Sequence, residues 1–290
     1  MVQAFIIQAL VTGGVYALLA VGFALIFGVG RILNLAHTAF LMLAAYGMFY
    51  FTARLGWPVG YTIVISLVGT TLIGIGSYKL FIDRIREHQV TVLLITIALA
   101  IVFQECMLLA FGAHFRSAPT LIEGYWEIMG VKVSYQHLLT LVVVLVVLLV
   151  IWALLSRTKL GIAIRATAQD AEIANLMGIN VSRILLITMG IATALVAVSG
   201  IVVAPLWTVY PYMWLNPLVM VMAIVVLGGL GSVKGSLVGA FIIGFVETAV
   251  VFFLPGGAFL STVFALVVMV IILVVRPEGL FGVVFEEERL

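Results

Sequence analysis

Charged side chains are scarce in this sequence: they make up 9% of the residues, against about 25% in an ordinary soluble domain. That shortage excludes a soluble globular fold. The net charge of +2 gives no electrostatic basis for binding nucleic acid, and the basic residues are better interpreted as markers of membrane topology. The single cysteine, Cys106, excludes an internal disulfide and a cysteine-rich metal site.

Motifs for enzymatic chemistry are also missing. The sequence has no HExxH metal motif and no GxSxG nucleophile motif. The glycine-rich stretch GGLGSVKG at 228–235 lacks the GxxxxGK[ST] spacing of a P-loop and the strand that precedes a dinucleotide-binding turn. We interpret it as a tight cytoplasmic turn. We therefore expect a chain that is not an enzyme and that binds no metal or cofactor of its own.

Apolar residues, at 65%, dominate what remains. Because about 20 consecutive apolar residues are needed to cross a bilayer, the sequence predicts an all-α integral membrane protein. We expect a single domain over residues 1–290, formed by a polytopic bundle of eight to nine spans. The predicted spans are at about 5–28, 33–53, 59–78, 90–112, 137–155, 184–204, 235–254 and 258–275.

Residues 184–233 contain no charged side chain and are too long for one span. Pro205, Pro211 and Pro217 interrupt them, and tryptophan and tyrosine residues between the prolines favour a membrane interface. The apolar element that follows, at about 217–230, has only about fourteen residues before the glycine turn. That length predicts a broken or re-entrant helix that lines a cavity.

The longest polar segment, residues 157–183, sets the predicted orientation. If this segment is cytoplasmic and the spans alternate, eleven of the fourteen basic residues face the cytoplasm. These are Arg31, Lys79, Arg84, Arg86, Arg157, Lys159, Arg165, Arg183, Lys234, Arg276 and Arg289. Arg54, Arg116 and Lys132 face the outside. The positive-inside rule then places the N-terminus outside and the C-terminus in the cytoplasm.

The same segment carries the signals of a short helix with defined ends. Asp170 is placed to cap it, with Glu172 in the favourable first turn. Gly178 suits the position just after its end, where a left-handed conformation is common. Between the two ends, one apolar stripe is formed by Ile173, Leu176 and Met177. The stripe either lies in the lipid surface or is offered to a partner protein.

Four polar residues lie inside apolar stretches and are candidates for lining a translocation path: Asn34, His37, Glu105 and Glu247. For Asn34 and His37, near a predicted cytoplasmic end, the alternative is that they bond to the backbone of a neighbouring helix. Glu105 looks buried. Glu247 lies on a helix with a ridge of small residues, Ser236, Ala240, Gly244 and Thr248, which favours close packing. A structural hydrogen bond at that packed interface is an equal alternative to a substrate site.

Four stretches together resemble the permeases of branched-chain amino acid ABC importers, the LivH type. The N-terminal one is GGVYALLAVGFALIFGVGRILNLAHTAFLMLAAYG at 13–47. The others are RTKLGIAIRATAQDAEIANLMGIN at 157–180, GGLGSVKGSLVGA at 228–240 and RPEGLFG at 276–282. The resemblance runs almost from end to end, and the four stretches occur in the same order as in that family.

The resemblance implies a channel-forming subunit without ATPase activity in a prokaryotic cytoplasmic (inner) membrane. Its partners would be a second, related permease, two cytoplasmic ATPases that bind ATP and magnesium, and a periplasmic solute-binding protein. Residues 156–183, including Arg165, would then form the loop that couples the permease to the ATPases. Such loops carry a Glu-Ala-Ala pattern followed by glycine; Glu172, Ala174 and Gly178 fit it, and Ile173 departs from it.

The sequence and the resemblance together predict import of branched-chain or related amino acids, driven by ATP hydrolysis on partner chains. Within the same class, the solute could instead be urea, a short amide or another small polar molecule, with a sugar less favoured. From another class, the chain would be a self-sufficient channel or a proton-coupled carrier that uses Glu105 and Glu247. A membrane scaffold that transports nothing is a third class.

Overall fold

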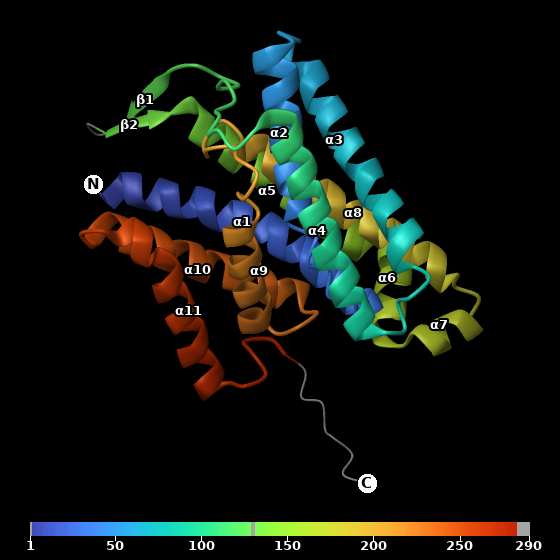
Figure 1. The fold of residues 1–290 in the computed structure, drawn as a ribbon. Helices are drawn as coiled ribbons and strands as arrows, with labels where there is room; N and C mark the ends of the chain where they lie inside the picture. Colours follow the sequence, from blue (N-terminus) through green and yellow to red (C-terminus); the bar gives the residue numbers. More distant parts are fainter. Residues whose placement is uncertain (1, 129–130, 283–290) are drawn as a thin grey trace.

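A computed structural model describes residues 2–128 and 131–282 as a helical bundle with one small hairpin (Figure 1). The long helices are α1 (Val2–Gly30), α3 (Val59–Ser77), α4 (Gln89–Phe111), α5 (Tyr135–Arg157), α8 (Val181–Val203), α10 (Val233–Phe253) and α11 (Gly257–Val275). The shorter ones are α2 (Ala39–Phe49), α6 (Lys159–Gln169), α7 (Ala171–Leu176) and α9 (Leu215–Gly228). Two π-helical turns follow α2 and α3, at Tyr50–Arg54 and Tyr78–Ile82.

Within the described ranges, seven helices are long and apolar enough to cross a membrane, which confirms a polytopic α-helical membrane protein. α1 and α8 form the centre of the bundle, because most of their residues are buried. α3, α4, α5 and α11 lie around them and expose most of their apolar side chains. Such exposure has no cost when the surroundings are lipid or another membrane subunit.

Two elements of the bundle are shorter than a full span, one of them as the sequence predicted. The region predicted as a span at 33–53 begins its helix only at Ala39, and α2 with its π-helical extension ends at Arg54. α9 has 14 residues, which at 1.5 Å per residue gives a length of about 21 Å. This is shorter than a hydrocarbon core of about 30 Å, as predicted for a broken helix. Most of α9 from Pro217 to Gly228 is buried in the bundle, whereas its first residues, Leu215 and Asn216, are exposed.

The stretch between the predicted spans at 90–112 and 137–155 contains secondary structure that the sequence did not indicate. Strands β1 (Tyr125–Ile128) and β2 (Val131–Ser134) pair antiparallel, with Tyr125 opposite Ser134. Ser134 then caps α5 by accepting a hydrogen bond from the Gln136 N–H. Four-residue strands of this kind leave little alternating pattern to detect in a sequence.

Small and hydroxyl-bearing residues face inwards on α3, which reverses the pattern of a soluble helix. Thr62, Ser66 and Thr70, spaced four apart, are buried. Gly74 continues this row and packs against Thr193 of α8. Helices in a membrane gain association energy from such close backbone approach, since apolar side chains are equally stable in lipid.

The small-residue ridge predicted around Glu247 is confirmed as a packing surface. Ser236, Ala240, Gly244 and Thr248 are all buried on α10, which packs lengthwise against α1 (Figure 1). At the tightest point, a Cβ added to Gly244 would lie 2.5 Å from the Gly13 Cα. The two helices can therefore approach this closely only with glycine at both positions.

Replacing Gly244 by Ala should destabilise the fold, because the added methyl group meets backbone that cannot move aside. We expect a loss of about 1–3 kcal/mol, as for overpacked cores. The measurement is the midpoint of thermal unfolding of the purified protein in detergent. Gly69→Ala on α3 is the matched control, since nothing lies within 4 Å of its added Cβ. Equal midpoints for the two variants would contradict the close α1–α10 contact.

The glycine turn and the C-terminal tail form one unit. The Leu280 and Phe281 N–H groups donate to the Leu227 and Gly228 carbonyls, at 2.8 and 3.1 Å. Gly229 has φ +99°, and an added Cβ there would lie 2.5 Å from the Gly282 nitrogen. The stretches at 228–240 and 276–282, far apart in sequence, are thus neighbours, and no phosphate-binding loop is formed.

Candidate functional site

The segment that the sequence singled out, residues 157–183, folds as two helices and not one. Thr158 caps α6, which the sequence analysis missed, by accepting from the Gly161 N–H at 3.0 Å. The Arg165 guanidinium donates to the Leu155 carbonyl at the end of α5, where an unpaired carbonyl favours a cation. Arg165 therefore ties α6 to the membrane helix. The sequence could have predicted α6 from two features. Thr158 is a suitable cap, and Ile164 and Thr167, three residues apart, both face inwards.

The predicted short helix is confirmed as α7, with both predicted ends. The Asp170 carboxylate accepts from the Ile173 N–H at 2.9 Å. At the other end Gly178 has φ +86°, its N–H donates to the Asn175 carbonyl, and the Ile179 N–H donates to the Ala174 carbonyl. This pair of bonds is a Schellman motif. Local residue types alone therefore define where α7 begins and ends.

The apolar stripe of α7 is exposed. Ile173, Leu176 and Met177 are 59%, 85% and 79% accessible, whereas Ala174 on the opposite side is buried. Glu172 and Asn175 border a cleft of about 720 Å³ that also contacts Arg31 and Arg86. Across this region the Arg86 guanidinium donates to the Ser182 hydroxyl at 3.1 Å. α7 thus presents three large apolar side chains beside a cleft with charges of both signs.

Replacing Asp170 by Ala should loosen α7 without unfolding the bundle. Losing one side-chain cap costs about 1 kcal/mol, which raises the equilibrium constant for opening of the helix about fivefold. Hydrogen–deuterium exchange of the amides in Ala171–Leu176 measures this change. Asp170→Asn, which keeps the accepting oxygen, is the control and should exchange like the parent. Unchanged exchange in Asp170→Ala would show that the cap contributes nothing.

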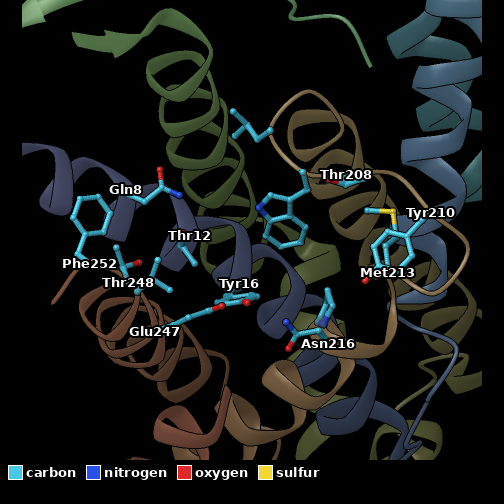
Figure 2. A pocket seen from close by; sticks show the side chains of 14 residues that line it. Gln8, Thr12, Tyr16, Thr208, Tyr210, Met213, Asn216, Glu247, Thr248 and Phe252 are labelled. Atoms are coloured by element: carbon cyan, nitrogen blue, oxygen red, sulfur yellow. The ribbon is translucent and has the colours of Figure 1, made fainter. Parts of the chain in front are cut away.

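A cavity of about 450 Å³ lies between α1, α10 and the link that precedes α9 (Figure 2). Gln8, Thr12 and Tyr16 reach it from α1, where their spacing of four places them in one row. Glu247 and Thr248 reach it from α10. Val251 and Phe252 of α10 also line it, and the rest of the wall comes from the proline-rich link and the start of α9: Leu206, Trp207, Thr208, Tyr210, Met213, Asn216 and Pro217.

Glu247 is the acidic residue of this cavity. Its carboxylate and the Tyr16 hydroxyl point toward one another (Figure 2). The carboxylate oxygen Oε2 is buried and has no hydrogen-bond partner among the described residues. Of the four polar candidates from the sequence, only Glu247 lines the cavity.

Asn34 and His37 lie inside the bundle but away from the cavity. The His37 Nε2 is 3.0 Å from the Leu19 carbonyl of α1, and its ring packs edge-on against Phe23. The Asn34 amide contacts the Met189 sulfur of α8 at 3.8 Å, and its oxygen accepts from the Ala36 N–H. His37 thus bonds to the backbone of a neighbouring helix, as in the alternative, whereas Asn34 contacts a side chain of α8 and the backbone of its own loop.

Glu105 is not buried, contrary to the sequence-based expectation. Its side chain is exposed on α4, and its carboxylate accepts from the neighbouring Gln104 amide at 3.1 Å. Gln104, which faces inwards, also accepts from the Trp214 indole at 3.0 Å. A carboxylate within an apolar run shows only that the helix is embedded; it does not determine which face the carboxylate occupies. The structure does not bring Glu105 and Glu247 together.

A bundle of long apolar helices that encloses a polar cavity and carries a capped polar segment is the architecture of a multi-pass membrane transport protein. Residues 5–273 match the family model described as the permease component of branched-chain amino acid transport systems. The chain belongs to this family of permeases.

Individual relatives agree with that assignment. The high-affinity branched-chain amino acid transport system permease protein LivH of Escherichia coli K12 is 27% identical, with 93% of this chain and 92% of LivH covered. The corresponding permease protein BraD of Pseudomonas aeruginosa is also 27% identical, with 96% and 94% covered. Among solved structures, PsaBC from Streptococcus pneumoniae in complex with Fab has a TM-score of 0.52 at 17% identity. The match covers 96% of this chain and 97% of the chain in that structure. This likeness supports the fold alone.

Proposed function

We propose that this chain is the permease subunit of an ABC importer that moves branched-chain amino acids into the cytoplasm. The observation that carries this proposal is the family match over residues 5–273. The chain itself would bind no nucleotide, and ATP with its magnesium would bind to separate ATPase subunits. A second, related permease and a periplasmic solute-binding protein would complete the importer in a prokaryotic inner membrane.

In the proposed orientation the N-terminus is outside and α6 and α7 are cytoplasmic. Arg31, Arg86 and Glu172 come from three different segments of the chain and border one cleft. These three segments therefore lie at the same end of the bundle. The positive-inside rule favours that end as cytoplasmic. Of the basic residues counted for this orientation, Arg289 lies outside the described residues. Nine crossings remain our proposal, with α2 and α9 as the two short elements.

The coupling surface is proposed to be the exposed stripe of α7. Large apolar side chains at 79–85% exposure, such as Leu176 and Met177, are placed to insert into a groove on a partner protein. The neighbouring cleft with Arg31, Arg86 and Glu172 supplies polar contacts around this centre. In the alternative, the stripe lies in the lipid surface and contacts no protein.

Uptake of radiolabelled L-leucine into proteoliposomes tests the proposed function. The complete set of two permeases, two ATPases and binding protein should accumulate leucine only when ATP is supplied on the ATPase side. Urea and a short amide, supplied instead of leucine, test the other solutes of the same class. Uptake by this chain alone, or no ATP-dependent uptake by the complete set, would reject the proposal.

A further inference from the structure

The cavity between α1, α10 and the link before α9 has the size and composition of a small-molecule site. Its volume of about 450 Å³ falls within the range of known ligand pockets, roughly 300–1,000 Å³. It also combines apolar walls with a few polar groups, as such pockets do. In the proposed orientation it lies in the outer half of the bundle, between the N-terminal half of α1 and the C-terminal half of α10.

Glu247 gives the cavity a hydrogen-bond acceptor that no protein group uses. Its carboxylate faces the Tyr16 hydroxyl in the cavity, and its oxygen Oε2 is buried without a hydrogen-bond partner among the described residues. Leaving a buried carboxylate oxygen unpaired is costly, which favours a ligand that donates a hydrogen bond there. Within residues 2–128 and 131–282, no lysine or arginine lines the cavity, so a cationic ligand meets no repulsion from these residues. An ammonium group satisfies both conditions.

Asn216 gives the cavity a donor on another wall. Its side-chain oxygen accepts a hydrogen bond from the Thr262 hydroxyl of α11 at 3.3 Å, which leaves the amide NH₂ to donate. In this first turn of α9, the Leu215 and Leu218 N–H groups already donate to the Tyr212 and Trp214 carbonyls, and Pro217 has no N–H. Asn216, which lines the cavity, therefore supplies the donors of this turn to a carboxylate.

The remaining walls suit an apolar side chain. Trp207 lies 6.4 Å from Tyr16, centroid to centroid, and Leu206 and Met213 also line the cavity. Aromatic faces additionally attract an ammonium group. The cavity thus offers an acceptor, a donor and an apolar surface together.

We propose that this cavity is a binding subsite for zwitterionic amino acids with apolar side chains, in which Glu247 accepts from the ammonium group and Asn216 donates to the carboxylate. The subsite rests on the proposed importer function and specifies where on this chain the solute is held. Selection for an amino acid would then occur in the permease as well as in the binding protein.

Cysteine labelling within the full importer complex measures occupancy of this cavity directly. Thr208 lines the cavity and is exposed, so Thr208→Cys places a reactive thiol at its wall. Cys106→Ser removes the single native cysteine of this chain. The rate of labelling at position 208 is followed with L-leucine, with 3-methylbutylamine, which lacks the carboxylate, and with 4-methylpentanoate, which lacks the ammonium.

The expected result is that leucine slows labelling and 4-methylpentanoate does not. Glu247→Gln should weaken protection by leucine and by the amine about tenfold to a hundredfold, as for a lost charged hydrogen bond. Asn216→Asp, which keeps the Thr262 contact, should weaken protection by leucine but not by the amine. Glu105→Gln is the matched control, because that carboxylate lies outside the cavity.

Two outcomes would overturn the subsite. One is a parent complex that imports leucine although leucine never slows labelling at position 208. The other is leucine protection that is unchanged in both Glu247→Gln and Asn216→Asp. Either variant alone suffices for this test if the other fails to insert. A parent complex without ATP-dependent leucine uptake would instead reject the importer function, so the two failures are distinguishable.

Discussion

Replacing Leu176 by Asp should abolish most ATP-driven leucine uptake by the complete importer while the permease still inserts and folds. Leu176 is 85% exposed and lies at the end of α7, so its loss leaves the packing of the bundle intact. If the stripe is the centre of the ATPase contact, a buried carboxylate there should cost at least about 2 kcal/mol of binding. That corresponds to about a thirtyfold weaker contact.

Uptake and ATP hydrolysis measured in the same proteoliposomes give the result as leucine imported per ATP. Leu176→Met is the matched control, because it retains an apolar side chain of similar volume and should behave like the parent. Elution as a single peak in size-exclusion chromatography confirms that each variant is folded. Normal uptake by Leu176→Asp would mean that α7 is only a helix on the membrane surface.

Replacing Gly178 by Val should have a comparably large effect for a different reason. Gly178 has φ +86°, a conformation that a β-branched residue adopts only with strain. An added Cβ would contact nothing within 4 Å, so any effect arises from the backbone and not from a clash. The strain would open the Schellman motif and alter the direction in which the chain leaves α7 for α8.

Leucine uptake by the complete importer should therefore fall about fivefold to thirtyfold in Gly178→Val, since a conformational strain of about 1–2 kcal/mol acts directly on the proposed coupling surface. Gly178→Asn is the control, because asparagine tolerates the left-handed region, and it should retain most of the uptake. Equal uptake by the Val and Asn variants would show that the end of α7 has no part in coupling.

Local sequence signals predicted the helix α7 well. Asp170 and Gly178 define the ends of α7 through hydrogen bonds made within four residues, so the sequence nearby contains all the necessary information. α6 was missed although Thr158 supplied a comparable cap. Long apolar runs likewise predicted the long helices, because the length needed to cross a bilayer is a strong constraint.

The cavity was beyond such local reasoning. Tyr16, Asn216 and Glu247 come from separate parts of the chain and meet only because α1 and α10 pack closely at Gly13 and Gly244. The row Gln8, Thr12 and Tyr16 was present in the sequence as polar residues spaced by four, but the sequence analysis did not identify it. The direction in which Glu105 points depends on how α4 is rotated in the bundle, which no local pattern specifies.

Photocrosslinking from position 176 tests most directly the claim that ATPases drive this permease through α7. In Cys106→Ser, Leu176→Cys carries a benzophenone, which captures whatever lies against the stripe in the assembled importer in its membrane. We predict a crosslinked species that contains this chain and an ATPase subunit. Capture of lipid alone, with no ATPase adduct, would contradict the account.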